Sequence, residues 1–269
     1  MKAISALKEL FAYRQMIYSL VKKDLRGRYK GSALGFLWTF INPLLQLGVY
    51  TVVFSFITRS VIKPYSLFLF VALIPWIFFS SSVTGGASSV LASKEMIKKI
   101  YFPREIMPIA NVTSSFVNML LCFFVIFGVL IVMGWGANFV ALLFLPLIMI
   151  IEYILCLGIA LLTSAFTVYF RDLEYILGIV TMAWMYLTPV MYPSSQVLDT
   201  LATTKYAQFA YLWYVNPMTP IIDAYRDILF YKRVPQMSTL LLAFGIGLFF
   251  VVVGYAVFRK LQRGFAEEL

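Results

Sequence analysis

The sequence predicts an all-α integral membrane protein with six transmembrane helices, and three observations support this. Of its 269 residues, 62% are hydrophobic and 13% are charged, whereas apolar residues make up about half of a soluble domain. Long stretches contain no Asp, Glu, Lys or Arg, and a helix needs about 20 such residues to cross the hydrocarbon core of a bilayer. Lys and Arg are concentrated in segments that alternate with these stretches.

The longest charge-free stretch, Ile106 to Ile151, is predicted to contain two helices. Its 46 residues would form a single helix of roughly 69 Å, more than twice the thickness of the hydrocarbon core. Gly134 and Gly136 allow the chain to turn back, and Trp135 between them suits a position among lipid headgroups. The six predicted spans are then residues 34–57, 67–92, 106–133, 139–170, 175–191 and 239–258.

The basic residues predict the orientation of these spans. Of the 22 Lys and Arg residues, 16 lie in the segments that alternate with the spans on one side, and six lie on the other. By the positive-inside rule, both termini are cytoplasmic and the protein is a multi-pass protein of the inner (plasma) membrane. The net charge of +10 follows from this topology and from contact with anionic lipid, so no nucleic-acid partner is expected. No cleavable signal peptide is expected either.

Residues 1–33 are predicted to form an amphipathic helix in the cytoplasmic headgroup layer. Aliphatic and aromatic residues recur there at helical spacing between Lys and Arg residues, a pattern typical of interfacial helices. A disordered basic tail is the alternative interpretation. At the other end of the chain, residues 259–269 are predicted to form a cytoplasmic tail.

Polar residues within the spans are candidates for helix contacts or for a polar pathway. Asn42 and Gln46 lie one turn apart in the first span, where exposure to lipid would be costly, and Pro43 between them can kink the helix. Residues 80–90 in the second span are mostly small, which favours close helix packing. Glu152 is the one acidic residue within a predicted span. We expect either a proton relay or substrate contact, or a protonated carboxyl bonded to a neighbouring helix.

The connector "SKEMIKKIYFPRE", residues 93–105, is predicted to form a short cytoplasmic helix. Ser93 is a plausible N-cap, and Pro103 would end the helix. A solvated loop is the alternative, but a loop would not need apolar residues on one face. That apolar face comprises Met96, Ile97, Ile100 and Tyr101, and the charged residues around it are Lys94, Glu95, Lys98 and Lys99.

Residues 193–238, on the outer side, are too apolar for an ordinary solvated loop. They are predicted to form re-entrant or interfacial short helices before the last span. A seventh span is not expected, because Pro217 and Pro220 would break it and because the basic C-terminus would then lie outside. An aromatic cluster is predicted at the outer exit: Tyr206, Phe209, Tyr211, Trp213 and Tyr214.

The sequence offers no catalytic centre, metal centre or nucleotide site. His is absent, Cys122 and Cys156 fall inside predicted spans, where a thiol behaves as a small hydrophobe, and the spacing of a phosphate-binding loop does not occur. Transport therefore ranks above membrane catalysis, such as glycosyl or acyl transfer. No internal repeat of a secondary transporter is visible, so the energy is expected from another chain. A passive channel would function without that partner.

Five segments, in order and over nearly the whole chain, resemble the membrane subunit of ABC type-2 exporters. The resemblance is to the polysaccharide export permeases, which move lipid-linked O-antigen, capsule or teichoic-acid chains. The segments are "DLRGRYKGSALGFLWTFINPLLQLGVYTVVFSFI" (24–57), "YFPREIMPIA" (101–110), "FRDLEYILGI" (170–179), "TPVMYP" (188–193) and "NPMTPIIDAYRDILF" (216–230).

This resemblance implies a half-transporter. Two copies of the chain would form the pathway, and two separate nucleotide-binding subunits would bind ATP and Mg²⁺, so this chain would carry no cofactor. The connector 93–105 would be the coupling helix that an ATPase subunit pushes, acting through Lys94, Met96, Ile97, Lys98, Lys99, Ile100 and Tyr101. The outer aromatic cluster would lie on gate helices.

A glycan cargo would favour an aromatic pathway, because aromatic faces stack on sugar rings while the polar tips of Tyr and Trp form hydrogen bonds. Arg28 and Lys30 would attract the pyrophosphate headgroup of the lipid carrier, or they serve topology alone. The alternative cargo is a small hydrophobic drug or lipid, which would require a greasier pathway. The candidate pathway residues are Trp38, Asn42, Tyr50, Trp184, Tyr186 and Tyr192.

Overall fold

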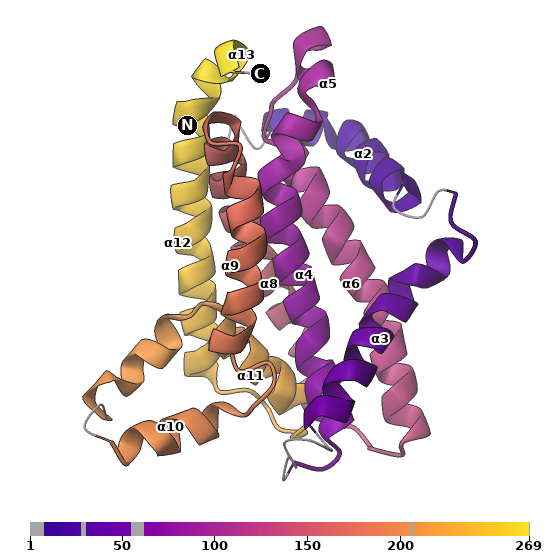
Figure 1. The fold of residues 1–269 in the computed structure, drawn as a ribbon, viewed down its shortest axis with the longest axis vertical. Helices are drawn as coiled ribbons and strands as arrows, with labels where there is room; N and C mark the ends of the chain where they lie inside the picture. The colour runs from indigo at the N-terminus through magenta and orange to yellow at the C-terminus, as the bar shows by residue number, and fades with distance from the viewer. Residues whose placement is uncertain (1–7, 28–30, 55–61, 205–206, 269) are drawn as a thin grey trace.

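The computed structural model describes residues 8–27, 31–54, 62–204 and 207–268 of the chain. The elements in these residues are helices, most of them aligned with the long axis of the molecule (Figure 1). The short helices α5 (Lys94–Lys99) and α13 (Phe265–Glu268) lie at one end, called the inner end after the predicted orientation. The helices α10 and α11 lie at the other end, called the outer end.

Four described helices are long and apolar enough to cross a membrane, judged by length and composition. They coincide with the predicted second, third, fourth and sixth spans. This finding agrees with the predicted integral membrane class. The helices are α4 (Tyr65–Ala92), α6 (Ile106–Val132), α8 (Leu145–Tyr169, preceded by α7, Phe139–Leu142) and α12 (Met237–Leu261).

The predicted first and fifth spans correspond to shorter helices. These are α3 (Trp38–Val52), which follows the 3-10 helix η1 (Gly35–Leu37), and α9 (Leu173–Leu187). Fifteen residues extend about 22 Å, less than the roughly 30 Å of a hydrocarbon core. The predicted fifth span extends to residue 191, but α9 ends at Leu187. It ends there because Thr188 adopts an extended conformation ahead of a proline. Two of the six predicted spans therefore remain predictions, and residues 55–57 lie outside the described residues.

The predicted reversal after the third span is confirmed. Gly134 and Gly136 both adopt positive φ angles, 59° and 70°, which glycine tolerates best. The Asn138 side chain then accepts hydrogen bonds from two backbone N–H groups in the first turn of α7. Trp135 stacks on Phe230 and donates to its carbonyl oxygen, so this predicted headgroup anchor also packs against the outer end of the protein.

Glycines bring α8 and α12 into close contact. A Cβ atom on Gly158 would collide with the backbone of Phe250, and one on Gly254 would collide with the carbonyl of Gly158. α4 packs against α6 on one side and α8 on the other, and a Cβ on Gly86 would lie 2.6 Å from the Cβ of Ala160. The prediction that small residues in the second span favour close packing is confirmed.

At the inner end, α2 (Arg14–Gly27) lies across α6, as expected for an interface helix. The predicted coupling helix over residues 93–105 is wrong in length, because α5 covers only Lys94–Lys99. Ser93 forms no side-chain cap, and Ile100 is already extended. The chain leaves the helix there because Phe102 is buried in a cluster beneath it, so the helix ends well before Pro103.

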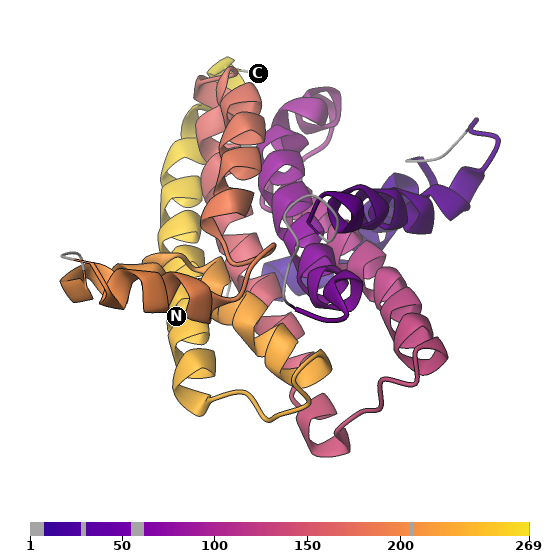
Figure 2. The same ribbon diagram turned by 60° about the horizontal axis from the view of Figure 1, so that its bottom comes forward.

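At the outer end, three short helices occupy the predicted excursion before the last span. Pro217 precedes α11, as predicted, but Pro220 lies inside its first turn, where the missing N–H had no helical partner. The expectation that Pro220 breaks a helix is therefore wrong. In Figures 1 and 2, α10 projects from the side of the bundle. The three helices are α10 (Ser194–Ala202), η3 (Ala207–Val215) and α11 (Met218–Leu229).

Candidate translocation surface

A line of small and polar residues follows the contact between α4 and α6. On each helix these residues recur at intervals of three or four, so they occupy one helical face. All but one are half-buried and therefore only partly covered by the chain itself; Ser115 is buried. We call these six residues the polar seam: Ser81, Gly85 and Ser89 on α4, and Asn111, Ser115 and Asn118 on α6.

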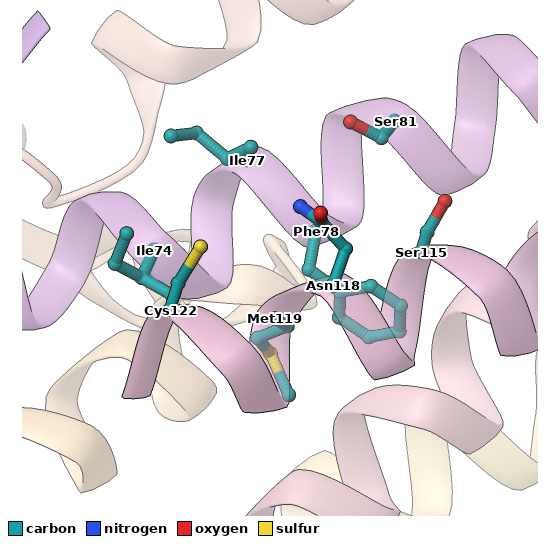
Figure 3. Close-up of a pocket in the computed structure, with 8 residues that line it drawn as sticks. All are labelled: Ile74, Ile77, Phe78, Ser81, Ser115, Asn118, Met119 and Cys122. Atoms are coloured by element: carbon teal, nitrogen blue, oxygen red, sulfur yellow. The ribbon is translucent and has the colours of Figure 1, made fainter. Parts of the chain in front are cut away.

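The outer half of the polar seam borders a small cavity. Its volume of about 10 Å³ is close to the least that holds one water molecule. Figure 3 shows Ser81 on one helix opposite Ser115 and Asn118 on the other, with apolar side chains around them. The Oδ1 atom of Asn118 is buried and has no hydrogen-bond partner among the described residues.

Nearer the inner end, the two helices meet at Gly85 and Asn111. A Cβ atom on Gly85 would lie 2.9 Å from both polar atoms of the Asn111 amide, so glycine leaves the room that the amide occupies. The Oδ1 of Asn111 also lacks a partner among the described residues. A buried carbonyl without a partner costs about 1–3 kcal/mol. The polar seam therefore contains two amide oxygens that have no partner among the described residues.

The polar seam ends in a larger hollow at the inner end, which we call the inner groove. It has a volume of about 480 Å³ and lies between α2, α4 and α6. Ser89 and Asn111 belong to both the seam and the groove, and Lys23 supplies a cation at the rim. Asp24 also lines the groove, and it accepts a hydrogen bond from Ser114 of α6, which holds α2 against the bundle.

α3 and α9 both pack against α4 and leave apolar faces uncovered. The side chains of Leu45 and Val49 on α3 are about three-fifths exposed, and those of Ile179 and Met182 on α9 are about two-thirds exposed. Apolar surface of this size is covered by lipid or by another protein chain.

The connector at the inner end is joined to the last helix. Arg104 donates a hydrogen bond to the carbonyl oxygen of Gln262 at 2.5 Å, and Glu105 forms an ion pair with Arg259 at 3.6 Å. A displacement of α5 would therefore reach the end of α12 directly. Lys94, Lys98 and Lys99 of α5 point into solvent.

Comparison with known proteins identifies the family. The family described as ABC-2 type transporter matches residues 15–230 of this chain. The chain belongs to this family. Its similarity to the O-antigen export system permease protein RfbA of Myxococcus xanthus is 32% identity over 99% of this chain and 100% of that protein.

Two further relatives extend the comparison. An O-antigen export system permease protein RfbA of Klebsiella pneumoniae is 33% identical over 94% of this chain and 95% of its own length. The polysialic acid transport protein KpsM of Escherichia coli is 21% identical over 92% of this chain and 93% of its own length.

In this ABC-2 type transporter chain, the predicted pathway residues of α9 and the following turn group at the outer end. Trp184 donates to Asn216 and packs edge-on against Phe79. Tyr192 donates through its hydroxyl to the carbonyl oxygen of Tyr186. Trp184 and Tyr192 therefore hold the structure together, whereas the Tyr186 side chain is exposed.

The predicted pathway residues on α3 are spread along that helix. Trp38 donates to Ser32 at its inner end, and Asn42 is exposed. Tyr50 packs against the main core, whereas Tyr186 of α9 is exposed.

The remaining predicted sites are only partly described. Arg28, Lys30 and Tyr206 lie outside the described residues, as does the side chain of Phe209. In the predicted gate, Tyr211 is exposed. Trp213 lies beside Tyr192, with 6.2 Å between ring centres, and Tyr214 lines a separate outer cleft.

Of the predicted coupling residues, Met96 and Ile97 face inward. They pack against the buried cluster at the inner end that contains Phe102. Ile100 and Tyr101 are exposed beyond the end of the helix. The prediction of a single apolar face on residues 93–105 is therefore wrong. Met96 and Ile97 anchor α5, whereas Ile100 and Tyr101 lie on the surface.

Glu152 is bonded to a neighbouring helix. It is fully buried, and its Oε2 accepts a hydrogen bond from the Tyr225 hydroxyl of α11 at 2.7 Å. This geometry agrees with the second of the two roles expected for it. Among the described residues, no group of three or more metal-ligating side chains could hold a metal ion.

Sequence reasoning missed the polar seam. Asn111, Ser115 and Asn118 lie in a charge-free span, and charge was the signal that drew attention to other positions. Their spacing of four and three residues would have revealed a polar face on the third span. The partner face at Ser81, Gly85 and Ser89 was interpreted as a packing surface alone.

Proposed function

We propose that this chain is the transmembrane subunit of an ATP-driven exporter of lipid-linked polysaccharide, of the O-antigen, capsule or teichoic-acid type. It would move this cargo from the cytoplasmic side across the inner membrane. The polar seam carries the proposal: amide and hydroxyl side chains run along the contact between α4 and α6. The Oδ1 atoms of Asn111 and Asn118 have no partner among the described residues, and sugar hydroxyls would donate to them. The full-length similarity to O-antigen export permeases supports the same cargo.

Two copies of the chain are proposed to enclose the pathway. One copy leaves the seam and the apolar faces of α3 and α9 partly uncovered on the same bundle. A second copy related by twofold symmetry would cover the apolar faces, as is usual for homo-oligomers. The seams of both copies would then line a shared passage. The predicted first and fifth spans supply those faces, so the six-span topology with cytoplasmic termini belongs to this proposal.

Energy is proposed to come from two nucleotide-binding subunits, which would bind ATP and Mg²⁺. The sequence of this chain lacks a phosphate-binding loop, and exposed lysines on α5 offer a basic surface at the inner end. The bonds from the connector to Gln262 and Arg259 would transmit movement of α5 to α12.

The inner groove is proposed to receive the headgroup of the lipid carrier. Lys23 would attract the diphosphate, and the hydroxyl groups of Ser89 and Ser93 would donate to its oxygens. The groove opens between α2 and the bundle, at the level where anionic headgroups lie. Arg28 and Lys30 follow α2 in the sequence and would add to this charge.

The deciding experiment isolates the complex from native membranes and reconstitutes it in nanodiscs and proteoliposomes. We expect an ATP-hydrolysing subunit to co-purify, lipid-linked glycan to stimulate ATP hydrolysis, and the glycan to become accessible on the opposite face of the proteoliposome. A complex without such a subunit, or hydrolysis indifferent to the glycan, would overturn the proposal. Stimulation by small hydrophobic compounds alone would favour the alternative cargo.

A further inference from the structure

A polar cleft lies at the outer end, away from the polar seam. Its volume of about 390 Å³ is within the range of small-molecule sites, about 300–1,000 Å³. One wall comes from α10 and η3, and the other comes from α11 and the start of α12. We call it the outer cleft, and its polar and aromatic lining is Ser194, Ser195, Tyr214, Asp223, Arg226, Asp227, Tyr231, Arg233, Gln236 and Thr239.

The walls of the outer cleft are fixed by internal bonds. Arg226 is fully buried and donates hydrogen bonds to the carbonyl oxygens of Pro189, Val190 and Tyr192. These bonds attach the cleft to the turn that follows α9. Its Nε is buried without a partner among the described residues, so the guanidinium is not fully satisfied by the chain.

The carboxylates of the outer cleft are already engaged. Asp223 accepts from the Ser194 hydroxyl at 2.7 and 2.8 Å, and Asp227 pairs with Arg233 at 2.7 Å. Burial raises the pKa of the Asp223 carboxyl, although the bond from Ser194 opposes this. These bonds leave lone pairs free to accept hydrogen bonds from hydroxyl groups. The ion pair with Arg233 also neutralises the charge of Asp227.

The lining of the outer cleft matches a sugar. Tyr214 lines one wall and Tyr231 lines the other, and aromatic rings of this kind pack on the apolar side of a sugar ring. The Arg233 guanidinium lies over the Tyr231 ring, 5.0 Å from its centre, so Tyr214 is the principal stacking residue of the proposal. Asp and Gln side chains accept from sugar hydroxyls, and Arg and Ser side chains donate to them. The two carboxylates and the two guanidinium groups cancel in formal charge, which matches uncharged sugars better than a polyanion.

We propose that the outer cleft binds uncharged sugar units of the exported glycan as it emerges from the pathway. This inference rests on the proposed function, because the glycan is the cargo named there. Pro193 and Ser194 line the cleft and directly follow the turn at the end of α9. The cleft therefore lies at the outer end of the bundle, beside the turn after α9, where it would hold the emerging chain against backward movement.

Photo-cross-linking in living cells tests this proposal with the native glycan. Ser195, exposed at the rim of the cleft, is replaced by the photoreactive residue benzoylphenylalanine. Gln208, exposed on η3 outside the cleft lining, receives the same replacement as a matched control. We expect illumination to attach the glycan to the chain at position 195 and not at position 208, with uncharged sugars in the captured polymer.

A second variant separates binding from mere proximity. Tyr214→Ala should lower the yield at position 195 about tenfold, the effect of losing roughly 1.4 kcal/mol of binding, whereas Gln208→Ala should leave it unchanged. Equal capture at both positions during normal glycan export would overturn the outer cleft and leave the proposed function intact. Capture of only an acidic polymer or of lipid would also overturn it. Export that is unaffected by deletion of this chain would instead overturn the proposed function.

Discussion

The buried guanidinium of Arg226 joins three carbonyl groups at the outer end of the bundle. It also lies over the ring of Phe68, with 3.7 Å between the guanidinium carbon and the ring centre. Arg226→Lys would keep the charge but lose the planar fork that reaches several acceptors. We expect the free energy of unfolding to fall by about 1–3 kcal/mol for each carbonyl left without a donor, measured by thermal unfolding in nanodiscs.

Arg233→Lys is the matched control for Arg226→Lys. The Arg233 side chain is about two-thirds exposed in its ion pair with Asp227, and exposed ion pairs contribute about 0–1 kcal/mol. A similar loss of stability in both variants would show that Arg226 does not organise the outer turn.

The amide of Asn118 provides a residue-scale test of the polar seam. Asn118→Leu keeps a side chain of similar size but removes the groups that would bond to a passing sugar. We expect glycan transport in proteoliposomes to fall about tenfold, as for a loss of roughly 1.4 kcal/mol, while the complex still assembles and hydrolyses ATP. Thr113→Val, on the face of α6 that bonds to Tyr153 of α8, is the control. Equal transport in both variants would remove the seam from the pathway.

Side-chain orientation is what the sequence could not supply at this scale. Trp184 and Tyr192 are aromatic and lie near the end of a predicted span, yet their polar tips bond to Asn216 and to a backbone carbonyl within the chain. Helix rotation decides whether such a residue faces a pathway or a neighbour, and composition does not encode it. Glu152 was identified because an acid in a span is conspicuous, but its partner Tyr225 depends on the docking of α11.

Close packing of α8 against α12 gives a prediction at the scale of elements. Gly254→Ala would place a methyl group against the carbonyl of Gly158, so the helices must separate. We expect a loss of about 1–3 kcal/mol, typical of overpacking, measured by thermal unfolding in nanodiscs. Gly245→Ala on the same helix has open space around its Cβ position and should be neutral or slightly stabilising. Equal losses would mean that the contact is not tight.

Long elements were predictable because their signals are long. Four spans followed from charge-free windows, and the reversal at Gly134 and Gly136 followed from the length that one helix cannot exceed. Short elements were less predictable, because tertiary contacts decide where they end. The sequence predicted that the helix of the connector continues past Phe102, but burial of Phe102 ends α5 early. It also predicted that Pro220 breaks a helix, but Pro220 is accommodated in the first turn of α11.

At the scale of the whole molecule, the seam, the groove and the connector form a continuous arrangement. The inner groove shares Ser89 and Asn111 with the seam, and α6, which carries half of the seam, follows directly after the connector. Arg104 and Glu105 connect that same junction to α12. Movement of α5 would therefore act on α6, which carries half of the seam, and on α12, which packs closely against α8.

This arrangement predicts that changes on α5 uncouple ATP hydrolysis from transport. Reversing the charge of the exposed residues Lys98 and Lys99, or introducing Ile100→Asp, would disrupt a basic and apolar contact with an ATPase subunit without altering the buried anchors Met96 and Ile97. We expect transport to fall at least about tenfold, with membrane insertion intact and ATP hydrolysis continuing. Lys260→Glu, also exposed at the inner end, is the matched control and should transport normally. If the α5 variants transport at the normal rate in an intact complex, the connector is only a solvated linker, and the drive must reach the bundle through α2 or α13 instead.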